Sequence, residues 1–96
     1  MIDKKLSSGK KTDNALIYTG PCYYYGFVCA SGKAKLTITI YDGVAAAGTV
    51  VEYYITDANK EMDGHEHANP VVCSDGLYLA LGGGTAIVYY VPQGTY

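Results

Sequence analysis

Residues 35–41, Lys-Leu-Thr-Ile-Thr-Ile-Tyr, decide the fold of this chain. Every second residue is aliphatic, namely Leu36, Ile38 and Ile40, and each of the three is followed by Thr or Tyr. Strict alternation is typical of a half-buried β-strand, because successive side chains point to opposite faces. The Asp-Gly pair at 42–43 is a strong turn signal. The segment therefore predicts a strand whose aliphatic face lines a core and which ends in a tight turn.

Similar segments lie on both sides of this strand. Turn signals rich in Gly, Pro, Ser and Asp separate them every eight to twelve residues, a spacing typical of a sandwich or jelly roll. No segment has a helical period, so no parallel βαβ nucleotide fold is expected. We predict an all-β fold, an antiparallel two-sheet β-sandwich or jelly-roll-like domain. Its other strands are expected at 14–19, 22–30, 49–56, 71–74, 77–81 and 85–91, with a polar surface loop at 57–70.

Length and composition narrow the class of protein. The 96 residues suffice for one domain, and 17% of them are charged against a usual ~25%. Eleven tyrosines and a net charge of −2 favour an assembling protein over a nucleic-acid binder. There is no apolar run of membrane-spanning length and no signal-peptide pattern, so we expect the cytoplasm or a particle assembled there.

Residues 1–13 differ from the rest of the chain. They are rich in lysine, carry Ser-Ser-Gly in the middle and show no periodicity. We divide the chain into an extended polar N-terminal arm at 1–13 and a β-sandwich domain at 14–96. The arm is expected to be mobile when the protein is alone.

Adjacent tyrosines place aromatic rings on both faces of three predicted strands. One face of each strand serves the core, and the other meets solvent, another chain or a ligand. Subunit contact is the first interpretation and sugar stacking the second. The predicted subunit-interface residues are Tyr23, Tyr24, Tyr25, Tyr53, Tyr54, Tyr89 and Tyr90.

Few residues could carry chemistry. His65 and His67 could share a metal ion with Asp63 as an oxygen ligand, because side chains two apart in an extended segment point the same way. Their position in an expected exposed loop favours plain solvated residues, so no metal and no cofactor are predicted. The three cysteines are expected to be buried free thiols, and no catalytic residue is identified. The glycines before Thr85 precede a strand and not a helix, so they predict a hairpin loop and not a phosphate site.

From about residue 14 to residue 91, the chain resembles small virion proteins of tailed bacteriophages. The resemblance rests on the sequence at 36–43, 47–51, 74–79 and 84–90. Capsid decoration (cement) proteins, head fibres and tail-associated modules often have this pattern on a β-sandwich. The resemblance carries over no catalytic residue, and the segment 57–70 departs from it.

The resemblance implies a virion structural protein that is not an enzyme. It would decorate or cement the capsid surface after assembly in the host cytoplasm, with the major capsid protein or other virion proteins as partners and a homotrimer as the self-associated form. Neither nucleic acid nor a membrane is an expected partner. The alternatives are a tail or neck component, a carbohydrate-binding module and, last, a metal-dependent enzyme. The arm would bind the shell or a sister subunit through Ile2, Lys4, Lys5, Leu6, Lys10 and Lys11.

Overall fold

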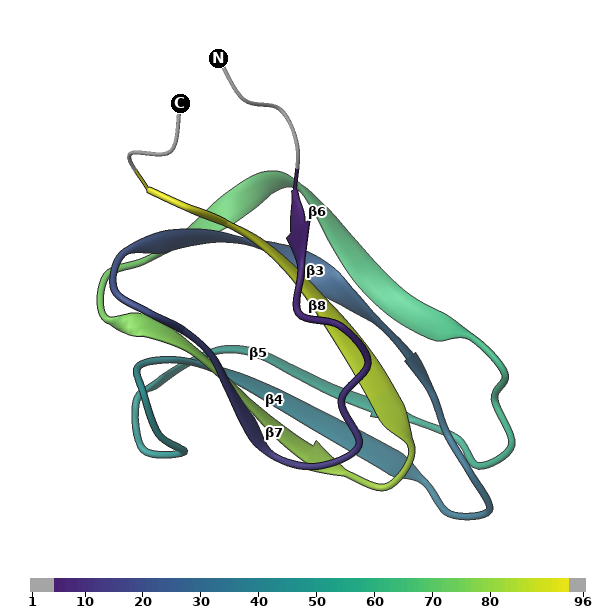
Figure 1. Cartoon of the computed structure of the whole chain (residues 1–96). Helices are drawn as coiled ribbons and strands as arrows, with labels where there is room; N and C mark the ends of the chain where they lie inside the picture. The colour runs from purple at the N-terminus through teal and green to yellow at the C-terminus, as the bar shows by residue number, and fades with distance from the viewer. Residues whose placement is uncertain (1–4, 94–96) are drawn as a thin grey trace.

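The computed structural model describes residues 5–93, which form eight β-strands in two antiparallel four-stranded sheets packed face to face (Figure 1). The β3 sheet has the strand order β1 (Leu6–Ser7), β8 (Thr85–Pro92), β3 (Cys22–Ala30), β6 (Asp63–Cys73). The β4 sheet has the order β2 (Ala15–Thr19), β7 (Gly76–Gly82), β4 (Leu36–Asp42), β5 (Thr49–Thr56). Over residues 5–93 there is no helix of the length and hydropathy that crossing a membrane requires.

The strand pairing is that of a jelly roll. β4 and β5 form a hairpin, and around it β3 pairs with β6, β2 with β7 and β1 with β8. The pairs alternate between the two sheets, so a long antiparallel ribbon is rolled into a sandwich. The predicted all-β sandwich is confirmed.

The core lies between the sheets and follows the alternation in the sequence. Leu36, Ile38 and Ile40 of β4 are fully buried, as the pattern at 35–41 predicts. The aliphatic face of β7 packs beside them, and the β3 sheet supplies Tyr24 and Phe27 among others. A continuous apolar layer between the two sheets is the main source of stability in a domain of this kind.

The expected loop at 57–70 is wrong over most of its length. Residues from Asp63 onward belong to β6, which pairs with β3 at the edge of its sheet. An edge strand tolerates Pro and charged residues, because one of its sides has no neighbouring strand to pair with. Pro70 and the polar residues of β6 therefore look like a loop in the sequence but occupy an edge strand in the fold.

Part of the arm lies on the sandwich. Leu6 and Ser7 form β1 beside β8, and the backbone N–H of Ser8 donates to the carbonyl of Val88 at 2.8 Å. Further along, Lys11 and Ala86 exchange two backbone hydrogen bonds of 2.8 and 3.0 Å. The segment from Leu6 to Lys11 is thus held against β8 of its own chain.

All three cysteines are buried and free, as predicted. Cys22 and Cys73 lie opposite each other on β3 and β6 and face the core. Burial raises the pKa of the Cys29 thiol to about 11. These thiols act as small apolar core residues.

Candidate functional site

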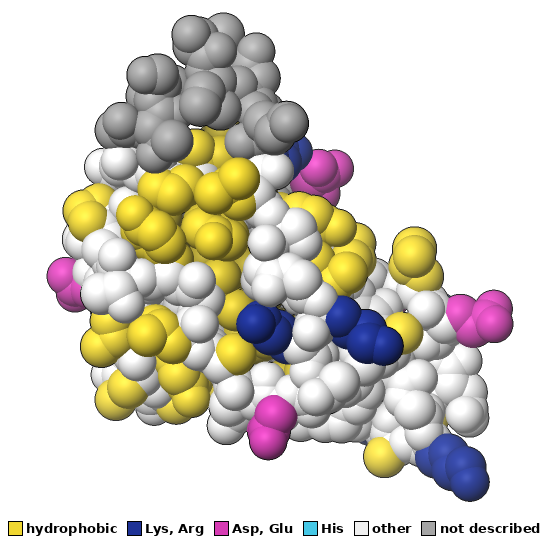
Figure 2. Space-filling model, in the orientation of Figure 1, with side chains coloured by type: hydrophobic (Ala, Val, Ile, Leu, Met, Phe, Trp, Pro, Cys, Tyr) yellow, Lys and Arg dark blue, Asp and Glu magenta, His cyan; other side chains and the backbone are white. Residues whose placement is uncertain are grey.

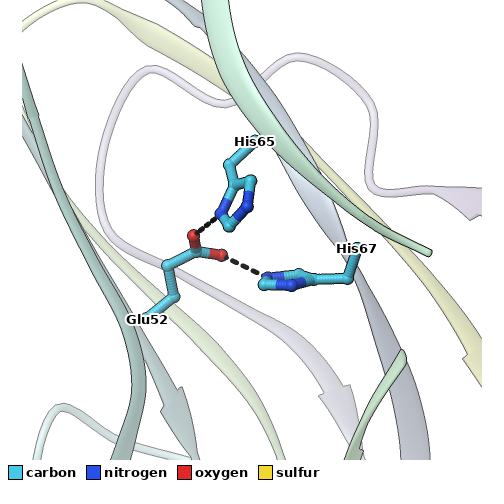
Figure 3. A group of neighbouring side chains, drawn as sticks. All are labelled: Glu52, His65 and His67. Carbon is cyan, nitrogen blue, oxygen red and sulfur yellow. Dashed lines mark hydrogen bonds and ion pairs between the residues drawn. The ribbon is translucent and has the colours of Figure 1, made fainter. Parts of the chain in front are cut away.

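The polar cluster of the molecule lies where the edge strands β5 and β6 face each other across the open side of the sandwich. Glu52 of β5 points toward β6, from which His65 and His67 point back. His67 Nε2 lies 2.9 Å from Glu52 Oε1, and His65 Nδ1 contacts Glu52 Oε2. Figure 3 shows both rings turned toward the carboxylate. The strand geometry brings together residues that are 13 and 15 positions apart.

The strand β6 contains a bulge that begins at His67. The register between β3 and β6 shifts between Tyr24 and Gly26, so four residues of β6 from His67 to Pro70 lie opposite Tyr25 alone. Bulges of this kind bend an edge strand and redirect side chains, and they are common beside functional sites. His65 and His67 share the inner side of β6 through the alternation of the strand, and the bulge begins at His67.

Glu52 is held from the inside of the molecule. Its side chain is only 9% exposed, and the fully buried Tyr24 donates its hydroxyl hydrogen to Oε1 at 2.6 Å. Burial acts to raise the pKa of Glu52, but hydrogen bonds from Tyr24 and the two histidines outweigh it and hold this pKa below its usual value. The carboxylate is therefore ionised, and each imidazole nitrogen that faces it is a donor.

Burial, followed by the hydrogen bond to Glu52, raises the pKa of Tyr24 far above its usual range. The hydroxyl therefore keeps its proton and remains a donor to the carboxylate. Tyr24 fixes the orientation of Glu52 from the core side, while the histidines contact it from the edge.

Asp63 does not join this cluster, so the oxygen ligand considered from the sequence is wrong. Its Oδ2 accepts a hydrogen bond from the hydroxyl of Thr56 at 2.7 Å, and Thr56 lies four residues beyond Glu52 on β5. This bond is the largest influence that holds the pKa of Asp63 below its usual value. Sequence reasoning missed Glu52. The alternation in β5 places it on the same face as Tyr54 and Thr56, but no local pattern indicates that its partners are on β6.

The seven predicted interface tyrosines divide into two groups. Tyr24 is buried in the core, Tyr54 packs edge-on against Phe27 at 5.2 Å, and Tyr90 packs inward beside Tyr18 at 5.6 Å. The prediction is therefore wrong for Tyr24, which is fully buried, whereas Tyr54 and Tyr90 are partly buried with their rings packed against the core. The group on the outer surfaces comprises Tyr23, Tyr25 and Tyr89 on the β3 sheet and Tyr53 on the β4 sheet.

The predicted attachment residues of the arm differ in their exposure and in their contacts with the domain. Lys5 pairs with Glu66 of its own chain at 2.8 Å and lies 4.8 Å from the centre of the Tyr25 ring. Leu6 is 41% exposed, Lys10 is exposed and Lys11 is bridged to β8. Ile2 and Lys4 lie outside the described residues. Of the predicted attachment residues that the structure describes, Lys5 has an ion-pair partner in its own chain, Leu6 and Lys10 are exposed, and Lys11 is partly buried.

The outer face of the β4 sheet carries no charged side chain on the paired residues of its strands. The strand register places only apolar, Thr and Tyr side chains there, and its most exposed members reach 48–60% exposure. Tyr41 and Tyr78 pair at its centre with ring centres 6.4 Å apart. The face consists of Leu16, Thr19, Thr37, Thr39, Tyr41, Val50, Tyr53, Ile55, Tyr78 and Ala80.

The outer face of the β3 sheet carries a groove of about 450 Å³. Tyr25, Tyr89 and Met62 are among its lining side chains, and Gly26 and Gly64 leave part of it without side chains. Both glycines have positive φ, and a Cβ on Gly26 would lie 2.2 Å from the carbonyl oxygen of His65. The closeness of the β3 and β6 backbones therefore requires glycine at this position.

Seen from the side on which β1 and β2 lie in front, hydrophobic side chains form a connected area and charged ones are few and scattered (Figure 2).

A comparison of the chain with protein-family models, curated proteins and solved structures finds no match.

Proposed function

We propose that this chain is a structural protein of a bacteriophage virion, without enzymatic activity, that decorates or cements the capsid by self-association and docking. The observation that carries the proposal is the uncharged outer face of the β4 sheet. A sheet face that presents Val50, Tyr53 and Ile55 to water at half exposure or more is costly for an isolated domain and suited to burial against protein.

Two further features support this proposal. The jelly roll is a fold that occurs in viral capsid proteins, although fold alone does not determine function. The sequence resemblance to phage virion proteins spans the strands that build the β4 sheet. The uncharged face also allows close approach of a neighbouring protein without desolvating charged groups.

The proposal changes the role of the arm. Lys5 already has a partner in Glu66, and Ser8 and Lys11 hydrogen-bond to β8, so much of the described arm is engaged with its own domain. We therefore assign attachment mainly to the sheet face. A trimer, as the resemblance implies, requires that this face contact a different surface of the neighbour, whereas packing on its own copy gives a dimer.

Co-sedimentation with undecorated heads of tailed phages tests the docking. The full chain should sediment with the heads, and Ile55→Lys should not, because it places a charge on the sheet face. Met62→Lys is the matched control: Met62 is also apolar and exposed, at 76%, but lies outside that face. Equal binding of both variants and the parent chain would rule out the face as the attachment surface.

A second candidate is glycan binding, which the groove on the β3 sheet favours. Its volume is within the range of small-molecule sites, and Tyr25 and Tyr89 supply rings on which a sugar can stack. Binding of a soluble oligosaccharide that is lost in Tyr89→Ala would support this function. The absence of binding across a panel of oligosaccharides would remove it.

A further inference from the structure

We propose that Glu52, His65 and His67 form a binding site for a divalent transition-metal ion, with Zn²⁺ as the best match, which connects the edge strands β5 and β6. One ligand atom from each of the three residues, two imidazole nitrogens and one carboxylate oxygen, lies within 4.8 Å of the others. Ligands bound to zinc at 2.0–2.2 Å are about 3.3 Å apart, so small side-chain movements would bring all three into the coordination sphere.

The donor set selects the class of ion. Imidazole suits zinc and its neighbours in the first transition row, whereas calcium and magnesium prefer oxygen ligands alone. Two histidines and one glutamate are a frequent three-ligand set for zinc and leave a fourth position for water or another ligand. The side chain of His65 is 52% exposed, so an ion can reach the site from solvent.

The surroundings of Glu52 support a cation here. The carboxylate side chain is only 9% exposed, and among residues 5–93 the basic side chains in contact with it are the two histidines alone. Tyr24 donates to Oε1 from the core and would orient the carboxylate as an outer-shell partner orients a ligand. The hydrogen bonds from the histidines describe the ion-free arrangement, in which two N–H groups occupy the place that the ion would take.

The proposed ion would stabilise a weak side of the sandwich. β5 and β6 belong to different sheets and share no backbone ladder, so side-chain contacts such as Thr56 with Asp63 connect them. An ion bound only by the folded chain shifts unfolding by mass action. At a free zinc concentration a hundred times the dissociation constant, the melting temperature should rise by roughly 10–20 °C.

The experiment uses the full chain, purified without an affinity tag and stripped with EDTA. We expect calorimetric titration with zinc chloride to give one ion per chain, and cobalt chloride to give the visible absorption bands of a low-coordinate site. His65→Ala is the first test variant, because the half-exposed ring can be removed with little effect on folding. It should weaken zinc binding by at least about 100-fold, more than the 10–100-fold loss typical of an outer-shell change.

Two variants make the test specific. Glu66→Gln is the matched control, because Glu66 lies between the two histidines but faces outward to Lys5, and it should bind zinc like the parent chain. Tyr24→Phe should fold and bind zinc about tenfold more weakly. The proposal is overturned if the parent chain takes up no zinc at millimolar concentration. Unchanged uptake in His65→Ala would also overturn it, since the ion would then be bound elsewhere.

Discussion

Asp42, at the end of β4, shows how one side chain connects distant turns of the sandwich. Its carboxylate accepts backbone hydrogen bonds from Ser74 at 3.0 Å, Asp75 at 2.9 Å and Gly76 at 3.4 Å. Burial acts to raise the pKa of Asp42, but these three donors outweigh it and hold the pKa below its usual value. The carboxylate thus fixes the β6–β7 turn to the β4 strand in its ionised form.

Asp42→Ala should lower the free energy of unfolding at pH 7 by about 1–2 kcal/mol, because hydrogen bonds to a charged group are lost from a partly exposed site. A depressed pKa stabilises the fold above the unfolded-state value near pH 4, and this contribution disappears as the pH falls through the folded-state pKa. Urea titrations at several pH values should show the gap between variant and parent closing below pH 4. A gap that stays constant down to pH 2 would contradict the assignment. Asp75→Ala, in the same turn, is the control.

At the same scale, Glu52 marks the limit of what the sequence could predict about the site. The spacing of His65 and His67 indicated a shared direction, which the structure confirms. The third member could not be predicted, because Glu52 approaches from the other sheet and nothing local connects it to β6. Asp63 was considered in its place because it is near in sequence, whereas the fold pairs it with Thr56.

At the scale of the elements, the inner face of β4 can be tested against its outer face. Ile38→Ala should reduce the free energy of unfolding by about 2–5 kcal/mol, because Ile38 is fully buried between the sheets. Thr37→Ala, on the outer face of the same strand, should change it by less than about 0.5 kcal/mol. Denaturant titration measures both values, and equal losses would mean that the face of Thr37 is buried as well.

The arm gives a second prediction for an element. The sequence alone predicts nearly unchanged melting for a chain that begins at Asn14. Besides the pairing of β1 with β8, the structure shows four hydrogen bonds between β8 and the arm residues Ser8 and Lys11, and the shorter chain would lose all of these contacts. At about 1 kcal/mol each, less the entropy of ordering the arm, we expect a loss of about 1–3 kcal/mol with the fold retained. Thermal unfolding of both chains measures this loss, and identical melting would mean that the arm contributes nothing to the domain.

Strands were predictable where alternation was strong. The aliphatic face of β4 and the residue range of β5 agree with the structure, because local pattern and tertiary burial act in the same direction there. The end of β6 was predicted as a strand at 71–74. The part from Asp63 to Pro70 was missed, because its inner face carries the histidine cluster and its outer face borders a groove, so no apolar alternation remains there. The register shifts of β3 and β5 depend on pairing partners and have no local signal.

At the scale of the whole molecule, the two sheets present different outer faces. The β3 sheet carries the Lys5–Glu66 pair, the arm and a groove. The outer face of the β4 sheet carries only apolar, Thr and Tyr side chains and is therefore uncharged. This asymmetry is what we expect of a domain that packs one face against other protein and leaves the other accessible. Self-association through the β4 sheet is therefore the central claim about function.

Sedimentation equilibrium of the full chain at micromolar concentration tests that claim most directly. Val50 and Val72 make a matched pair, since they are 52% and 59% exposed on the outer faces of the β4 and β3 sheets respectively. The account predicts a mass of two or three chains for the parent protein, the same mass for Val72→Lys and a single-chain mass for Val50→Lys with unchanged folding. A parent chain that sediments as a monomer, or a Val50→Lys variant that associates like the parent, would contradict it.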